Sequence, residues 1–285
     1  MDVPDKVKKM CVSPIRLKVT LKQPLVDREK MSIQVYDSLE VPCGKCVECA
    51  KAYSSEWALR ICLEAAQYKE NCCLTLTYNN EHLPADNQLC RRDIQLFIKR
   101  LRKSLYPQKI RYFYAGEYGS LRGRPHYHCI VFNYFPKDAL PFYEKNGNQF
   151  YKSEALAKLW DKGFVDVGQV DYRTAFYCAK YLQKVGKWKD FVVQPFVGMS
   201  LKPSIGLHAI DGDDLARGCL YFNGQKYALP RSFIRSLERQ GVDLTALKLK
   251  RREHIEFMQS LETYQSWAAS IQSRRKKSDE FLKTP

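Results

Sequence analysis

The sequence predicts an α+β fold in which a central, mostly antiparallel sheet is flanked by helices. Between residues 70 and 190, segments with strand and helix patterns follow each other in the order strand, helix, strand, strand, helix, strand, helix. Farther on, Asn223-Gly224 lies between two apolar runs and predicts a β-hairpin. The chain has 285 residues, 45% of them hydrophobic, which is enough for a sizeable core. We therefore expect an N-terminal segment with a cysteine cluster (1–68), a central core (69–190) and a C-terminal hairpin with a helical, basic region (191–285).

The individual elements follow from periodicity and from cap residues. The first helix is expected from Ser54 to about Tyr68, with Ser54 or Ser55 available as its N-cap. Residues 93–105 form the clearest amphipathic helix, because their basic residues lie largely off an apolar stripe. Pro125 is expected to open a strand that runs to 132, a position that tolerates proline. Further strands are expected at 31–36, 71–78, 110–115 and 164–170, and further helices at 153–160, 172–185, 231–240 and 244–273.

The charge of the chain indicates an anionic partner. It carries 47 basic and 31 acidic residues, a formal net charge of +16 and a pI near 9.3. Such a surplus is typical of nucleic-acid-binding proteins, although it also serves solubility alone. The first residues resemble no signal peptide and no run approaches the roughly 20 apolar residues of a membrane span, so we expect no membrane association. The 11 cysteines are then expected to be reduced, as in a cytoplasm.

Two histidines have the spacing of metal ligands on one face of a strand. His126 and His128 are two residues apart, so they point the same way, while Tyr127 points to the other face. If 111–117 and 126–132 pair as a hairpin, Glu117 falls opposite His126 and on the same face. Two imidazoles and a carboxylate suit Mg²⁺ or Mn²⁺ acting on a phosphodiester. The alternatives are incidental strand histidines and a Glu117 that caps a turn; zinc hydrolysis is a rival, but the chain has no His-Glu-x-x-His helix.

Two tyrosines have the spacing of paired nucleophiles on one face of a helix. Tyr177 and Tyr181 lie one turn apart, so both hydroxyls can approach one phosphate in turn. Lys180 and Lys184 follow each by three positions and are candidates to assist at the phosphate. A free phenol has a pKa near 10, so it needs a polarised target or a cationic neighbour to attack well. The alternative is an ordinary amphipathic helix with two core tyrosines.

A cysteine cluster suggests a structural metal site. Cys43, Cys46 and Cys49 are separated by two residues each time, and Cys11 is available as a fourth thiolate. Four thiolates are the ligand set of structural Zn²⁺. The cluster lacks a second Cys-x-x-Cys pair, so the spacing alone leaves core cysteines as an alternative.

Three motifs in a fixed order give the chain a family resemblance. They are 74–78 (Leu-Thr-Leu-Thr-Tyr), 124–128 (Arg-Pro-His-Tyr-His) and 177–181 (Tyr-Cys-Ala-Lys-Tyr), with 116–119 (Gly-Glu-Tyr-Gly) before the histidines. In these the chain resembles the HUH-type rolling-circle replication initiators, most closely the replication-associated proteins of microviruses of the gokushovirus branch, which include Chlamydia phages. The resemblance covers roughly residues 40–190. It implies an HUH endonuclease-like sheet with the histidines on a central strand and the tyrosine helix alongside.

The resemblance also implies an activity. Family members nick one DNA strand at a replication origin, stay linked to the 5′ phosphate through a tyrosine, and religate without ATP. The chain has no Gly-x-x-x-x-Gly-Lys-Ser/Thr loop, so a host helicase is expected to unwind the DNA, alongside a host polymerase in the bacterial cytoplasm. The alternative is a non-catalytic regulator that binds single-stranded nucleic acid. Candidates for contacts to the DNA backbone are Arg122, Arg124, Lys99, Arg100, Arg102 and Lys103.

Overall fold

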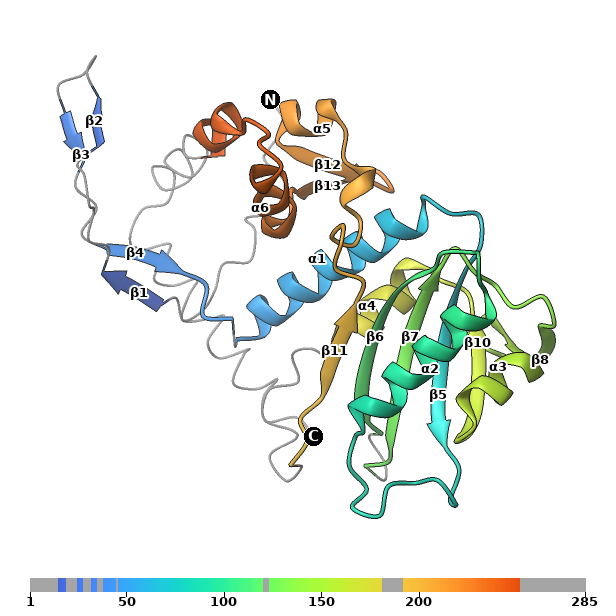
Figure 1. Cartoon of the computed structure of the whole chain (residues 1–285). Helices are drawn as coiled ribbons and strands as arrows, with labels where there is room; N and C mark the ends of the chain where they lie inside the picture. The colour runs from blue at the N-terminus through green and yellow to red at the C-terminus, as the bar shows by residue number, and fades with distance from the viewer. Residues whose placement is uncertain are drawn as a thin grey trace. The chain divides into compact units, whose positions relative to one another are not determined.

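The structure is a computed structural model, drawn in Figure 1, that describes residues 15–18, 25–27, 32–34, 38–44, 46–119, 123–180 and 192–251. The chain divides into two compact units, Met1–Ala52 with Gln259–Pro285, and Tyr53–Met258. The three-part division proposed from the sequence, with boundaries after 68 and 190, stays a prediction. No helix of the described ranges is both long enough and apolar enough to span a bilayer.

The first unit contains two small antiparallel sheets. Strand β1 (Ile15–Lys18) pairs with β4 (Ser38–Val41), and β2 (Leu25–Asp27) pairs with β3 (Ser32–Gln34). Strand β3 lies inside the strand expected at 31–36. The unit continues through the cysteine cluster into helix α1 (Val47–Ala65), which extends into the second unit.

The second unit is built around a seven-stranded sheet. Its strand order is β11-β6-β7-β5-β10-β9-β8, and every neighbouring pair is antiparallel. The sheet and its flanking helices confirm the α+β fold class. The strands are β5 (Asn71–Tyr78), β6 (Arg111–Tyr118), β7 (Pro125–Phe132), β8 (Leu140–Lys145), β9 (Asn148–Lys152), β10 (Gly163–Gly168) and β11 (Phe196–Met199).

Helices cover both faces of this sheet (Figure 1). Helices α2 (Arg91–Ser104) and α3 (Glu154–Trp160) pack on one face, in a core that includes Leu74, Phe97 and Tyr127. Helix α1 and helix α4 (Tyr172–Lys180) pack on the other face, in a core that includes Trp57, Ile130 and Cys178. Since successive residues of a strand point to opposite faces, His126 and His128 share the face of Ile130 and α4.

Two phenols fix the other face of β7 to α2. The Tyr127 hydroxyl donates to the Cys90 carbonyl at 2.8 Å, and the Tyr78 hydroxyl donates to Asp93 Oδ2 at 2.7 Å. The two hydroxyl oxygens lie 2.8 Å apart. Burial raises the pKa of both phenols, so they stay protonated and keep donating. The strand that carries the histidines is thereby held from behind.

The C-terminal part of this unit packs on the outer side of α1. Leu59 and Leu63 of α1 meet Leu220, Phe233 and Leu247 in a third apolar cluster. Asn223 and Gly224 have φ values of 48° and 71°, which confirms the hairpin predicted from this pair. The elements are a 3₁₀ turn (Leu207–Ala209), α5 (Gly212–Arg217), β12 (Cys219–Phe222), β13 (Gln225–Ala228) and α6 (Arg231–Arg239), followed by a helical stretch at 245–251.

Two expectations about the elements were wrong or incomplete. Helix α1 begins at Val47 rather than at Ser54, and Ser54 is buried inside it, where its hydroxyl donates to the Ala179 carbonyl at 3.5 Å instead of capping the helix. The hairpin of β8 and β9 was not expected, although it turns on Asn146-Gly147, with φ values of 53° and 75°. The proline in β8 hid it, because proline is tolerated in an edge strand such as this one.

Candidate active site

The site is built on the hairpin of β6 and β7. Glu117 pairs with His126 and Ala115 pairs with His128, which confirms the strand pairing expected from the sequence. On the other side of β7, Thr75 pairs with His128 in strand β5. Directly paired residues share a face, so Glu117, both histidines and Thr75 are placed together by strand register alone.

Glu117 and the two histidines converge on one point. Glu117 Oε1 lies 2.9 Å from Nε2 of His126 and 2.9 Å from Nε2 of His128. One ligand atom from each of the three residues lies within 4.8 Å of the others. Glu117 is buried, with 1% of its surface exposed; burial alone would raise the pKa of its carboxyl, but the hydrogen bonds with His126 and His128 outweigh it and lower the pKa. The carboxylate is therefore ionised at neutral pH.

The outer partners of the histidines orient their Nε2 atoms toward Glu117. Nδ1 of His126 lies 3.1 Å from the Arg124 carbonyl, which can only accept, so this nitrogen carries the proton. In the neutral ring Nε2 is then an acceptor that faces the acceptor Oε1 of Glu117. Nδ1 of His128 lies 3.2 Å from the Thr75 hydroxyl. Such outer partners commonly fix the tautomer of metal-binding histidines.

A divalent cation fits this donor set. Two acceptors 2.9 Å apart require a cation that both can share, either a proton or a metal ion. The second carboxylate oxygen of Glu117, Oε2, is buried and has no hydrogen-bond partner among the described residues. A buried carboxylate oxygen of this kind is satisfied when it coordinates a metal. Glu117, His126 and His128 can thus hold one ion while its remaining coordination positions face the open side of the site.

Tyr177 lies against this triad. Its ring meets the His128 ring edge to face, with centroids 5.2 Å apart and an angle of 85° between the planes. The apolar face of α4 buries Ala175, Cys178 and Ala179 against the sheet, and Tyr177 remains 46% exposed. Tyr177 is therefore a solvent-accessible phenol beside the histidines rather than a core residue.

The structure limits what can be said of the other predicted catalytic residues. Lys180 ends helix α4. Tyr181 and Lys184 lie outside the described residues.

The predicted DNA-backbone residues are not gathered at the triad. Arg124 donates to the Tyr78 carbonyl at 2.9 Å and to Asn80 Oδ1 at 3.0 Å, and Arg122 lies outside the described residues. Lys99, Arg100, Arg102 and Lys103 belong to α2, on the sheet face opposite the histidines. Arg100 is also paired with Asp161 at 2.8 Å. A role of α2 in DNA binding stays a prediction, and it concerns DNA away from the triad.

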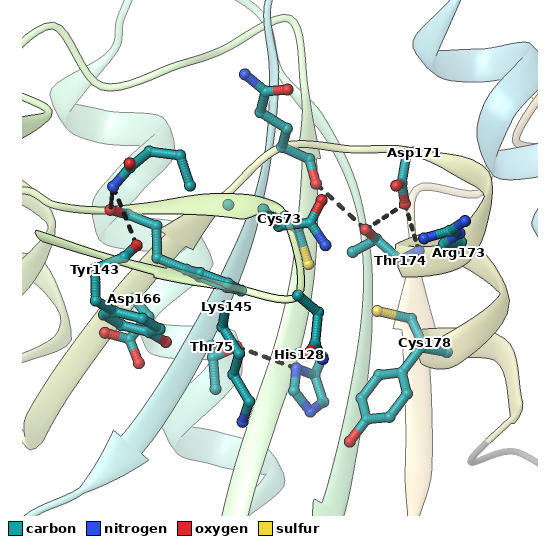
Figure 2. Close-up of a pocket in the computed structure, with 18 residues that line it drawn as sticks. Cys73, Thr75, His128, Tyr143, Lys145, Asp166, Asp171, Arg173, Thr174 and Cys178 are labelled. Carbon is teal, nitrogen blue, oxygen red and sulfur yellow. Dashed lines mark hydrogen bonds between the residues drawn. The ribbon is translucent and has the colours of Figure 1, made fainter. Parts of the chain in front are cut away.

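Sequence reasoning missed a pocket beside the triad. A cavity of about 730 Å³ is lined by His128 and Tyr177 together with the β8–β9 hairpin and the start of α4 (Figure 2). Lys152 and Asp166 form an ion pair of 2.6 Å next to it. The Asn146-Gly147 pair was the signal that could have located this hairpin.

The cysteine cluster of the first unit is the second group with metal-binding geometry. The sulfurs of Cys43, Cys46 and Cys49 all lie within 4.8 Å of one another. Cys43 Sγ and Cys49 Sγ are 4.0 Å apart, and the Cys46 backbone N–H donates to Cys43 Sγ at 3.3 Å. A tetrahedral zinc ion with Zn–S bonds of about 2.3 Å would space its sulfurs by about 3.8 Å. Cys11, the proposed fourth ligand, lies outside the described residues.

Comparison with known proteins places these features in a family. Residues 71–186 match the family described as Replication-associated protein ORF2. The chain is 33% identical to Replication-associated protein VP4 of Bdellovibrio phage phiMH2K over 238 residues, covering 78% of this chain and 75% of the relative. It is 32% identical to Replication-associated protein ORF2 of Spiroplasma virus 4 over 269 residues, covering 85% and 83%.

A third relative matches a shorter stretch. The chain is 39% identical to Replication-associated protein ORF4 of Chlamydia phage 1 over 155 residues, covering 52% of this chain and 39% of the relative. No solved structure matches.

Proposed function

Because the chain belongs to the family of phage replication-associated proteins, we propose that it serves viral DNA replication as a metal-dependent nickase. It cuts one strand at the replication origin, holds the new 5′ end on a tyrosine and later reseals the strand. The observation that carries this proposal is the position of Tyr177, an exposed phenol in ring contact with His128 of the Glu117–His126–His128 triad.

The triad suits Mg²⁺ or Mn²⁺, because it combines one carboxylate oxygen with two imidazole nitrogens. When bound, the ion supplies Lewis-acid polarisation of the scissile phosphate. The protein residues do the positioning. Strand register aligns the three donors, the Arg124 carbonyl and the Thr75 hydroxyl hold the imidazoles, and the α2 side of the sheet keeps β7 in place.

The nucleophile in this proposal is the hydroxyl of Tyr177. Its oxygen forms a bond to phosphorus while the bond from phosphorus to the 3′ oxygen breaks. The phenol loses its proton and the leaving 3′ oxygen gains one. One phosphodiester is exchanged for another, so attack by a 3′ hydroxyl on the phosphotyrosine reseals DNA without ATP.

The second tyrosine would make a second cut before the first linkage is resolved. Tyr181, one helical turn from Tyr177, is assigned this role, and Lys180 and Lys184 are assigned to assist at the phosphate. A host helicase and a host polymerase in the bacterial cytoplasm would complete the reaction cycle.

The test is a covalent adduct. The protein is incubated with labelled single-stranded fragments of its viral genome and Mn²⁺, then denatured and resolved by size. A labelled band at the mass of protein plus DNA supports the nickase. DNA binding without any adduct would instead support the regulator that binds single-stranded nucleic acid.

We further propose that Cys43, Cys46 and Cys49, with Cys11, hold a structural Zn²⁺. Protein purified without added metal should contain about one zinc per chain by elemental analysis, because three preplaced thiolates bind zinc strongly. Cys46→Ser should lose the zinc and lower the melting temperature. Cys90→Ser, a half-buried cysteine outside the cluster, is the matched control and should keep both. Zinc-free wild-type protein with a normal Cys46→Ser variant would overturn the site.

We also propose that α2 follows the DNA backbone. Lys99 and Lys103 are exposed and form no ion pair within the described part of the chain. Changing both to alanine should weaken binding to all single strands alike and reduce the slope of log affinity against log salt by about 1.4, since each phosphate contact contributes about 0.7. Lys158→Ala, an exposed lysine of α3, should leave the slope unchanged. Equal slopes for all three proteins would mean that α2 does not touch DNA.

A further inference from the structure

The pocket beside the triad has two walls that meet at the reaction site. One wall is the β8–β9 hairpin, with Tyr143 and Lys145, and the other is the start of α4, with Arg173 and Thr174. Figure 2 shows His128 between the two walls. Tyr177 also lines the cavity. A molecule in this pocket would therefore lie next to the phosphate that the proposed nickase cuts.

The unpaired charges of the pocket are positive. Lys145 and Arg173 lie on opposite walls, both exposed, and neither has a hydrogen bond or ion pair from its side chain to another residue of the described part. The acidic groups are already engaged. Asp166 pairs with Lys152 at 2.6 Å, and Asp171 accepts from the Thr174 backbone N–H and hydroxyl at 2.6 Å each. The pocket thus favours an anionic ligand.

One wall offers a flat aromatic surface. The rings of Tyr143 and Phe150 are stacked, with centroids 4.7 Å apart and planes within 9° of parallel. Gly168 lies under Phe150, where a Cβ would come within 3.4 Å of the ring. The absence of a side chain there allows the ring to lie against β10. Stacked aromatic rings next to cations are the usual platform for bases of single-stranded nucleic acid.

The pocket also contains polar groups that can read a base edge. Asn146, Asn148 and Gln169 line it, and their side chains form no hydrogen bond to another described residue. Gln149 differs, because its amide donates to the Tyr143 carbonyl at 3.0 Å and the Phe150 carbonyl at 2.8 Å and so stiffens the hairpin. Amide side chains pair with base edges through a donor and an acceptor at once.

From these features we infer that the pocket between the β8–β9 hairpin and α4 takes one unpaired base of the DNA strand, next to the phosphate to be cut. The base stacks on Tyr143, its edge faces the free amides, and the flanking phosphates lie between Lys145 and Arg173. The inference rests on the proposed nickase for its meaning. Asp171 already caps the start of α4, so a phosphate held by that helix end alone is disfavoured.

A crosslinking experiment without catalysis tests the location. A twelve-residue oligothymidine with one central 5-iodouracil is bound to the full chain in EDTA, irradiated and digested, and the crosslinked peptide is identified by mass spectrometry. The expected crosslink lies at Tyr143 or Phe150. Crosslinks confined to other segments would overturn the inference. No nicking occurs in EDTA, so this result does not depend on whether the adduct assay succeeds.

Affinity measurements with matched variants test the chemistry. Wild-type protein should bind the oligothymidine about tenfold more tightly than an abasic oligomer with the same number of phosphates, by fluorescence anisotropy. Tyr143→Ala should remove most of that preference, and Tyr221→Ala, an exposed tyrosine of β12, should not. The double variant Lys145→Ala/Arg173→Ala should weaken binding of both oligomers severalfold, whereas Lys158→Ala/Arg235→Ala, which changes two exposed cations elsewhere, should not.

The outcomes separate the two proposals. An unchanged preference in Tyr143→Ala overturns base binding in this pocket even if the adduct forms. Should the adduct fail while the crosslink and the variants behave as expected, the pocket remains a base-binding site of a protein that does not cut. Lys145 and Arg173 are exposed, so their replacement tests the site even if Tyr143→Ala disturbs the hairpin.

Discussion

Changing both Tyr177 and Tyr181 to phenylalanine should reduce the covalent DNA adduct by a factor of at least about 10³, because the nucleophilic hydroxyls are lost. Phenylalanine keeps the ring, so the edge-to-face contact between position 177 and His128 should persist. Binding of single-stranded DNA is expected to remain. The measurement compares adduct formation and anisotropy for the same protein preparations.

The single variants and a matched control give this prediction its resolution. Tyr177→Phe alone should lower the yield of the first cut, and Tyr181→Phe alone should permit cutting but impair release of a closed circle. Tyr172→Phe removes a hydroxyl from the same helix, where the ring stacks on Phe176, and should cut normally. An undiminished adduct in the double variant would remove both tyrosines from the mechanism.

The parts of the site that the sequence predicted are those fixed by local periodicity. Strand alternation places His126 and His128 on one face, and a short hairpin leaves few registers, so Glu117 could be placed opposite His126 before the structure was known. Helical spacing likewise places the buried positions Ala175 and Cys178 on the sheet side of α4 and Tyr177 away from it.

The parts that were missed depend on contacts between distant segments. Strand β11 is four residues long and becomes a strand by pairing Phe196–Met199 with Phe113–Gly116. Strand β8 is an exposed edge strand with weak alternation, so no apolar pattern marks it. Helix α1 extends back to Val47 through the cysteine cluster, where no cap residue was recognised. The pocket lies where β8–β9 and α4 meet, which sequence spacing does not encode.

The two sheet faces have different tasks in this proposal. The face of α2 and α3 has a large aromatic core and a pair of hydrogen-bonded phenols behind β7. The other face carries Glu117, both histidines and Tyr177, together with the pocket. Replacements of exposed α2 residues should therefore change DNA affinity without changing the chemistry of the cut.

Replacing either histidine of the triad by alanine should stop nicking while the fold persists. His126→Ala and His128→Ala should each cost more than the roughly 10- to 100-fold that is lost with an outer partner of a metal ligand. Both side chains lie at the open side of the sheet, so we expect a small change in melting temperature. EDTA should stop the wild-type reaction, and Mg²⁺ or Mn²⁺ should restore it.

A direct measurement of metal binding separates loss of the ion from loss of the fold. Wild-type protein should bind one Mn²⁺ at this site, followed by calorimetry or by electron paramagnetic resonance, and His128→Ala should bind it far more weakly. His82→Ala, which changes an exposed histidine outside the triad, should behave like the wild type. Glu117→Gln keeps the size of the buried side chain but removes the charge, so it should also lose Mn²⁺. Because Glu117 Oε1 bridges both histidines, unchanged Mn²⁺ affinity in Glu117→Gln would remove only the carboxylate from the site, whereas full nicking in EDTA would remove the metal altogether.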